Sequence, residues 1–145
     1  MAALMSKFVF ANSPAPALGA AGFASGGVRA VLRLEGAAAF AVAVALYAHA
    51  GFSWLLFALL LLAPDLAMLA YLTGPRAGAF VYNLAHTYAL ALPLALAGFF
   101  LGSALASTFA LIWVAHIGLD RMLGYGLKYQ SGLGDTHLGC IGRGH

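Results

Sequence analysis

Four side chains of the kinds that bind metal ions lie within long apolar stretches of this sequence. They are Asp65, His86, His116 and Asp120. Ionisable groups inside helices that cross lipid cost roughly 2.5–3.5 kcal/mol each, so such residues are candidates for function. Imidazole together with carboxylate suits zinc, iron or manganese better than copper or an iron–sulfur cluster. The pattern predicts a site for one divalent metal ion (zinc, iron or manganese) with these four residues as its ligands.

Spacing along the chain supports the convergence of these groups. His116 and Asp120 are four positions apart, so a helix presents both on one face. Asn83 and His86 are three positions apart and share a face in the same way. Counted at about 1.5 Å per residue, the polar groups lie roughly 7–16 Å below one membrane surface. The other half of the membrane receives almost only apolar side chains, so we expect one buried polar site.

Two further residues complete the expected site. Glu35, in the first apolar stretch, is the candidate general base. Asn83 is expected to orient a metal ligand or the substrate. Water bound to a metal loses a proton near neutral pH and becomes a nucleophile. We therefore predict a membrane enzyme that hydrolyses an ester or phosphoester of an amphiphilic small molecule, which enters from the cytoplasmic leaflet.

Structural interpretations of the same residues stay open. Asp120 is next to Arg121 and Glu35 is near Arg33, so both carboxylates are also candidates for ion pairs. His86 is also a candidate for a core histidine bonded to a backbone carbonyl. The chain would then be a non-enzymatic accessory or structural membrane subunit whose polar cluster fixes helix packing. A proton or metal-ion carrier is disfavoured, because the far half of the membrane offers no polar path.

The elements that must position these groups are four apolar segments, each close to the ~20 residues that cross roughly 30 Å of hydrocarbon. They cover residues 30–50, 52–73, 78–101 and 103–127. The breaks between them are short, so consecutive helices should be antiparallel neighbours. Pro64 removes a backbone hydrogen bond and is expected to kink the second segment beside Asp65. We predict an all-α fold, a four-helix transmembrane bundle with antiparallel up-down order and short loops.

The composition requires lipid around these helices. Of the 145 residues, 63% are hydrophobic and 8% are charged, against roughly a quarter charged in a soluble domain. The net charge of +3 comes from basic residues scattered along the chain, and these form no patch for nucleic acid. We expect the lipid bilayer and an amphiphilic substrate as partners, and no nucleic acid.

Charge and glycine content assign the sides of the membrane and the tails. In an even-numbered bundle all seven Lys and Arg residues fall on the side of the two termini, and the positive-inside rule makes that side the cytoplasm. Residues 1–28 are expected to be a flexible N-terminal tail, residues 29–128 the four-helix domain, and residues 129–145 a Gly-rich cytoplasmic tail. This last tail is either solvated or folded over the site, with Asp135 or His137 reaching inward.

Several short motifs occur in a fixed order outside the N-terminal tail. They are Leu34–Gly36, Pro64–Leu66, Gly74–Arg76, Tyr82–Tyr88, His116–Arg121, Gly124–Tyr129 and Thr136–Gly139. Together they resemble an uncharacterised bacterial family of small four-helix membrane proteins, domain of unknown function 4260, over about Arg33 to Arg143. The resemblance implies the four-helix fold and a location in the bacterial cytoplasmic (inner) membrane. It implies no particular activity.

A second, weaker resemblance is to bacterial membrane-bound metal-dependent hydrolases. The pairs Pro64-Asp65 and His86-Thr87 correspond to a Pro-Asp and a His-Thr that recur in those enzymes. The Arg-Gly that precedes the His-Thr there is replaced by Leu84-Ala85 in this chain. What this resemblance implies is limited to a metal-dependent hydrolytic activity at these positions.

Overall fold

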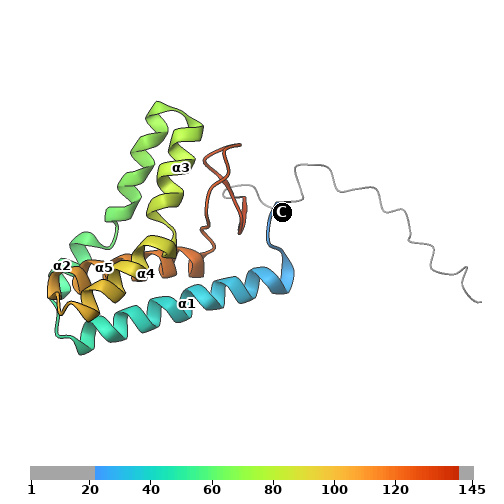
Figure 1. Ribbon diagram of the computed structural model, residues 1–145. Coiled ribbons are helices and arrows are strands. Elements are labelled where there is room, and N and C mark those ends of the chain that lie inside the picture. The colour runs from blue at the N-terminus through green and yellow to red at the C-terminus, as the bar shows by residue number, and fades with distance from the viewer. Residues whose placement is uncertain (1–21, 141–145) are drawn as a thin grey trace, which may run out of the picture.

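Helices dominate the structure, a computed structural model that describes residues 22–140 (Figure 1). In chain order they are α1 (Gly26–His49), α2 (Trp54–Leu60), the 3-10 helix η1 (Ala63–Thr73), α3 (Pro75–Ala85), α4 (Tyr88–Phe100) and α5 (Ala104–Leu123). The strands β1 (Asp135–Thr136) and β2 (Gly139–Cys140) pair antiparallel. The predicted all-α class is confirmed. Most of the predicted N-terminal tail and the last residues of the C-terminal tail lie outside the described residues.

Three helices form one layer of the molecule. The first helix, α1, runs antiparallel along α5, and α4 packs on α5 as well (Figure 1). Gly36 and Gly118 bring the two backbones together where α1 crosses α5, since a methyl group on Gly118 would lie 2.6 Å from the amide nitrogen of Phe40. Small residues permit this approach between membrane helices, which the hydrophobic effect does not drive together.

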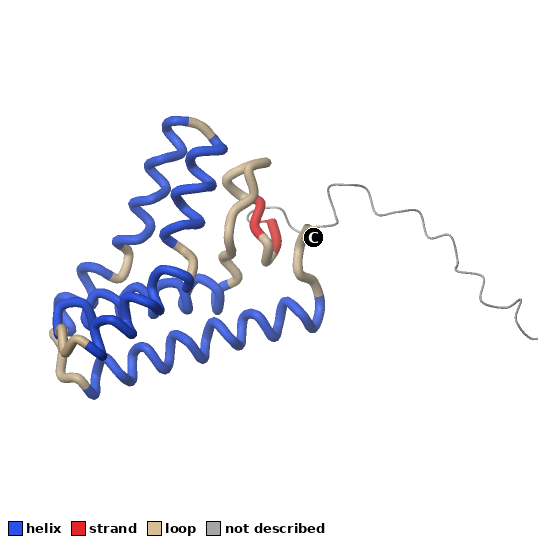
Figure 2. The backbone as a smooth tube through the Cα atoms, in the orientation of Figure 1, coloured by secondary structure: helices blue, strands red, loops and turns tan. Residues whose placement is uncertain are grey.

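The helices η1 and α3 form a hairpin that projects from this layer (Figures 1 and 2). Gly74 connects them with a φ of 129°, a backbone conformation that favours glycine. Gly78 lets the ring of Tyr71 lie against the backbone of α3, because a methyl group at Gly78 would overlap that ring. The two helices of the hairpin are therefore held close together near its tip.

The second and third apolar segments, predicted as single helices, are each broken in two. Between α2 and η1 the break lies just before Pro64, which confirms the expected kink. Between α3 and α4 it falls at His86 and Thr87, where the Thr87 hydroxyl accepts a hydrogen bond from the Ala89 amide and caps α4. Both breaks therefore lie beside predicted metal ligands, the first beside Asp65 and the second at His86.

Apolar side chains cover the outside of the helices, as lipid contact requires. Large exposed examples are Leu55, Leu59, Leu66, Phe80, Phe99 and Phe100. Three helical segments, 26–49, 54–73 and 75–100, are long and apolar enough to cross a membrane. The fourth predicted span, α5, is not one of these three; it carries His116, Asp120 and Arg121, and both α1 and α4 pack on it. The chain is an integral membrane protein.

The segment after α5 folds back onto the helices instead of extending into solvent (Figure 2). Thr136 and Leu138 have no exposed surface. The Ala24 amide donates to the His137 carbonyl over 2.8 Å, so the segment also meets the start of α1. Of the two possibilities left by the sequence, solvated or folded, the structure shows the folded one.

Candidate metal centre

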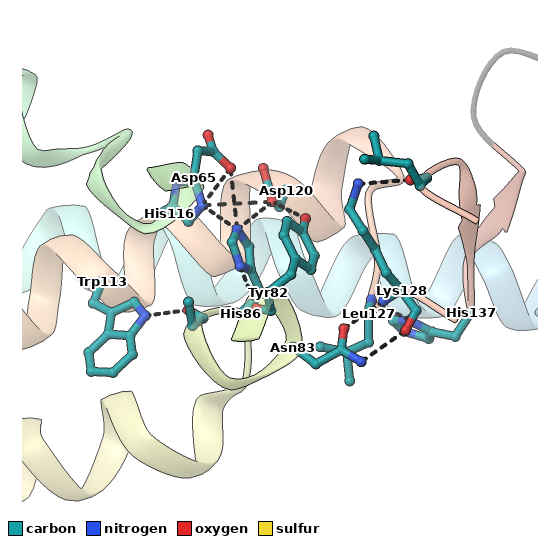
Figure 3. Close-up of polar contacts among 12 residues, drawn as sticks. Asp65, Tyr82, Asn83, His86, Trp113, His116, Asp120, Leu127, Lys128 and His137 are labelled. Atoms are coloured by element: carbon teal, nitrogen blue, oxygen red, sulfur yellow. Dashed lines mark hydrogen bonds and ion pairs between the residues drawn. The ribbon is translucent and has the colours of Figure 1, made fainter. Parts of the chain in front are cut away.

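The four predicted ligands lie together at the base of the hairpin (Figure 3). Asp65 comes from the first turn of η1, and His86 from the residue after α3. His116 and Asp120 come from one face of α5, as their spacing predicts. Each of the two helix breaks therefore lies beside one predicted ligand. The break turns the chain so that this side chain faces α5, which a continuous helix would not do.

The four ligand atoms have the spacing of a metal coordination shell. The His86 Nε2 atom is 3.3 Å from Asp65 Oδ1 and 3.6 Å from Asp120 Oδ2. The His116 Nε2 atom is 3.6 Å and 3.7 Å from the same two oxygens. All four atoms lie within 4.8 Å of one another. Ligands at ~2.0–2.1 Å from a tetrahedral zinc are about 3.3–3.4 Å apart, so one ion fits among these atoms with little movement.

The tautomer of His86 is fixed by its surroundings. Its Nδ1 atom is 2.8 Å from the Tyr82 carbonyl oxygen and must donate to it, which leaves the Nε2 lone pair directed into the cluster. Metal-binding histidines are commonly oriented in this way. The ring also stacks on Tyr82, with centroids 3.7 Å apart. The predicted contact between His86 and a backbone carbonyl is present, and it turns the Nε2 atom toward the other three groups.

The environment of His116 is drier and less complete. Its side chain is 1% exposed, and within residues 22–140 its Nδ1 atom has no hydrogen-bond partner. Its Nε2 atom faces His86 Nε2 over 3.0 Å. At this distance only one of the two nitrogens can carry a proton, because two N–H groups would clash. A cation between the nitrogens could instead be bound by both lone pairs.

Asp120 belongs to the cluster and not to an ion pair with its neighbour Arg121. Its Oδ2 atom faces both histidines and accepts a hydrogen bond from the Tyr82 hydroxyl over 3.4 Å. The Arg121 guanidinium instead lies over the ring of Tyr88, 5.2 Å from its centre. Tyr82 was not predicted as part of the site, although its position four residues before His86 was a signal that the two share a helix face.

A cleft of about 610 Å³ lies beside the cluster and reaches two of its carboxylates. It is lined by Asp65, Met68, Tyr82, Asp120, Tyr125, Lys128, Leu133 and Gly134. The C-terminal segment thus supplies one wall of the cleft, but neither Asp135 nor His137 reaches the cluster. Lys128 was not predicted, because no spacing rule marks a single Lys in a Gly-rich segment.

Asn83 holds the protein backbone and does not face the cluster. Its Nδ2 atom donates to the Lys128 carbonyl over 2.9 Å, and its Oδ1 atom accepts from the Lys128 amide over 2.7 Å (Figure 3). The expectation that Asn83 orients a metal ligand directly is therefore not met. It acts instead on the position of Lys128.

Glu35 is not brought to the cluster, contrary to the expectation that it lines the same space. It is exposed on α1, next to the glycine that packs against α5. Because Gly36 takes the inward position, its neighbour is turned outward. The expected partner of Glu35, Arg33, donates to the Met122 carbonyl over 2.8 Å.

Burial affects two titratable side chains of the C-terminal segment. It lowers the pKa of the Lys128 ammonium, an effect that the carboxylates of Asp120 and Asp65 oppose. It also lowers the pKa of His137, and the positive charge of Arg121 acts in the same direction. The His137 Nδ1 atom accepts a hydrogen bond from the Leu127 amide over 2.8 Å, which requires the neutral imidazole.

Comparison with known proteins places the chain in a family without assigning an activity. No curated protein and no solved structure is significantly similar to it, so the weaker resemblance to metal-dependent hydrolases finds no support there. One family model matches residues 29–141, nearly the whole region that contains the helices, the cluster and the folded C-terminal segment. The chain belongs to the family described as Domain of unknown function (DUF4260).

Proposed function

We propose that this membrane protein is a metal-dependent hydrolase that acts on an ester or phosphoester of an amphiphile. The proposal is supported by one observation: four ligand atoms within 4.8 Å of one another adjoin an open cleft of about 610 Å³. Polar contacts that only fix helix packing need no cleft beside them. A reaction centre needs both the ligands and the space.

Each residue of the cluster has a defined part in this proposal. His86, His116, Asp65 and Asp120 would hold one divalent ion, which when bound would lower the pKa of a water and polarise the bond to be cleaved. Asp65, the most exposed ligand with 39% of its side chain accessible, replaces Glu35 as the general base. Its Oδ1 atom faces the histidines, so its second oxygen would be the one to take up the proton of the attacking water.

The surroundings of the cleft favour an amphiphilic substrate. The helix η1 lines the cleft through Asp65 and Met68, and its other face exposes Leu66, Leu69 and Leu72 at 67%, 62% and 86%. Lipid covers such side chains in a membrane. A molecule with its tail in that lipid can place its head group in the cleft.

A second function is favoured by the completeness of the cluster. Four protein ligands fill a tetrahedral shell, as in structural zinc sites, whereas catalytic sites keep a position open. The cluster also joins η1, α3 and α5 at one point. In this alternative the chain is an accessory or structural membrane subunit, and the ion fastens the hairpin to the layer.

Metal analysis combined with turnover distinguishes the two functions. Purified protein should contain about one divalent ion per chain, measured by elemental analysis, and His116→Ala should lose it. It should also release product from a panel of phospholipids and acyl esters, and lose this activity on chelation. Stoichiometric metal without turnover across the panel favours the structural subunit. Absence of metal after incubation with zinc, iron and manganese contradicts both forms of the metal centre.

A further inference from the structure

Lys128 lines the cleft, and among residues 22–140 its ammonium group makes no ion pair with a carboxylate. Its side chain is 6% exposed, and its Nζ atom donates to the Leu133 carbonyl over 2.8 Å. The same atom lies 4.6 Å from the centre of the Tyr82 ring and 5.9 Å from that of Tyr71. A carbonyl and two ring faces orient a cation, but they do not neutralise it.

The two carboxylates nearest to this ammonium are engaged elsewhere. In the part of the chain that the structure describes, Asp65 and Asp120 make their ion pairs with His86 and His116. An ammonium has three N–H donors, and the Leu133 carbonyl uses one of them. The remaining donors are available to a molecule that occupies the cleft.

Charge balance then identifies the kind of molecule that fits. With a divalent ion bound, the charges of Asp65 and Asp120 are balanced, and neutral imidazoles add none. The ammonium of Lys128 is left as the net charge of the cleft. A largely buried cation gains most from an anion with several acceptor oxygens, and a phosphate group has them.

We infer that Lys128 binds the phosphate of the substrate, so that the cleft takes a phosphoester amphiphile in preference to a neutral carboxyl ester. This inference rests on the proposed function, which supplies the balancing ion. Tyr82 also lines the cleft, and its hydroxyl is engaged by Asp120 Oδ2.

Asn83 is the positioning residue for this interaction. Its amide bonds both the N–H and the C=O of Lys128, so the backbone at that residue cannot rotate freely. Lys side chains have high conformational entropy, and a fixed backbone lowers the cost of holding the ammonium in one place. Asn83→Ala should therefore weaken phosphate binding while leaving the metal ligands in place.

The test measures binding of three probes to zinc-loaded protein in detergent by calorimetry. The probes are dihexanoyl phosphatidic acid, dihexanoylglycerol as its neutral counterpart, and inorganic phosphate. Wild type should prefer phosphatidic acid to dihexanoylglycerol. Lys128→Met should weaken phosphatidic acid binding about 10- to 100-fold, as loss of a charged hydrogen bond implies. Lys128→Arg should retain most of the binding, and Lys128→Gln provides a polar substitute if the Met variant does not fold.

The outcomes separate this inference from the proposed function, because metal content is measured on the same samples. Metal-loaded protein that binds dihexanoylglycerol as well as phosphatidic acid overturns the inference, and so does equal phosphatidic acid binding by wild type and Lys128→Met. Inorganic phosphate that binds as tightly as the lipid overturns the assignment to an amphiphile. Protein that takes up no metal overturns the proposed function, whatever the probes do.

Discussion

The Nε2 atoms of His86 and His116 lie 3.0 Å apart, although 30 positions separate them in the chain. The tautomer of His86 directs its lone pair toward His116, since its other nitrogen donates to the Tyr82 carbonyl. Two carboxylate oxygens lie within 3.7 Å of these nitrogens. If His116 carries its proton on Nδ1, all four groups present lone pairs to one point, and a cation at that point stabilises them most.

Zinc should therefore raise the melting temperature of the purified protein. A ligand present at about a hundred times its dissociation constant adds roughly 2.7 kcal/mol to the free energy of unfolding. The measurement is a thermal melt in detergent with and without zinc, after prior chelation. Asp120→Asn should abolish the increase, and His49→Ala is a matched control because His49 is exposed at the far end of α1. An equal increase in wild type and Asp120→Asn would place the zinc elsewhere.

Removal of a single cluster residue should destabilise the protein even without metal. His116→Ala or Asp65→Ala leaves the remaining polar groups of a buried cluster without a partner, which costs ~1–3 kcal/mol. Thermal melts in the presence of a chelator measure this effect. If both variants melt like wild type, the cluster does not contribute to the packing of η1 and α3 against α5.

The sequence predicted the four cluster residues because two simple rules applied to them. Charged groups in apolar segments are costly, and the helical spacing of His116 and Asp120 fixes their common face. It also predicted the kink at Pro64, since proline acts locally. The break at His86 and Thr87 was not predicted, because it depends on capping by Thr87 and on contacts with α5 that only the folded chain provides.

Glu35 and Lys128 show the limit of reasoning from depth alone. The depth count put Glu35 beside the cluster, but its direction around the helix is set by the packing of Gly36 on α5. Lys128 enters the cleft because Asn83 holds its backbone from a position 45 residues away. Neither rotation about a helix nor a long-range loop contact can be read from local spacing.

The crossing of α1 and α5 should tolerate no side chain at Gly118. A methyl group there would lie 2.6 Å from the Phe40 amide nitrogen and 2.8 Å from the Gly36 carbonyl oxygen. Gly118→Ala should therefore lower the free energy of unfolding by ~1–3 kcal/mol, the usual cost of overpacking. Gly27→Ala is the control, since nothing lies within 4 Å of a methyl group at that helical position. Chemical or thermal unfolding of both variants measures the difference.

The C-terminal segment should loosen in mild acid. Because burial lowers the pKa of His137 below its unfolded value of 6.5, the unfolded chain takes up a proton first as the pH falls. The stability that neutral His137 contributes is fully present above the unfolded pKa and is lost as the pH falls from there toward the folded pKa.

His137→Gln isolates this effect from the titration of the cluster histidines. Glutamine retains an acceptor for the Leu127 amide but does not titrate. Between about pH 7.5 and 5.5, the melting temperature of wild type should therefore fall more than that of His137→Gln. Parallel curves for the two proteins would show that the bond from Leu127 to His137 does not depend on the neutral imidazole.

The last prediction concerns the sides of the membrane. The start of α1 and the C-terminal segment meet, because the Ala24 amide bonds the His137 carbonyl. The connections after α1 and after α4 lie at the opposite end of α5, where Gly98 packs against Ser107. We expect both termini in the cytoplasm and both of these connections outside it, as the positive-inside rule predicts.

Ala50→Cys and Leu101→Cys, in a Cys140→Ser background, place thiols at exposed helix ends without replacing a glycine of positive φ. An impermeant maleimide added to intact cells should label both, and labelling of both only after the cytoplasmic side is opened would reverse the orientation.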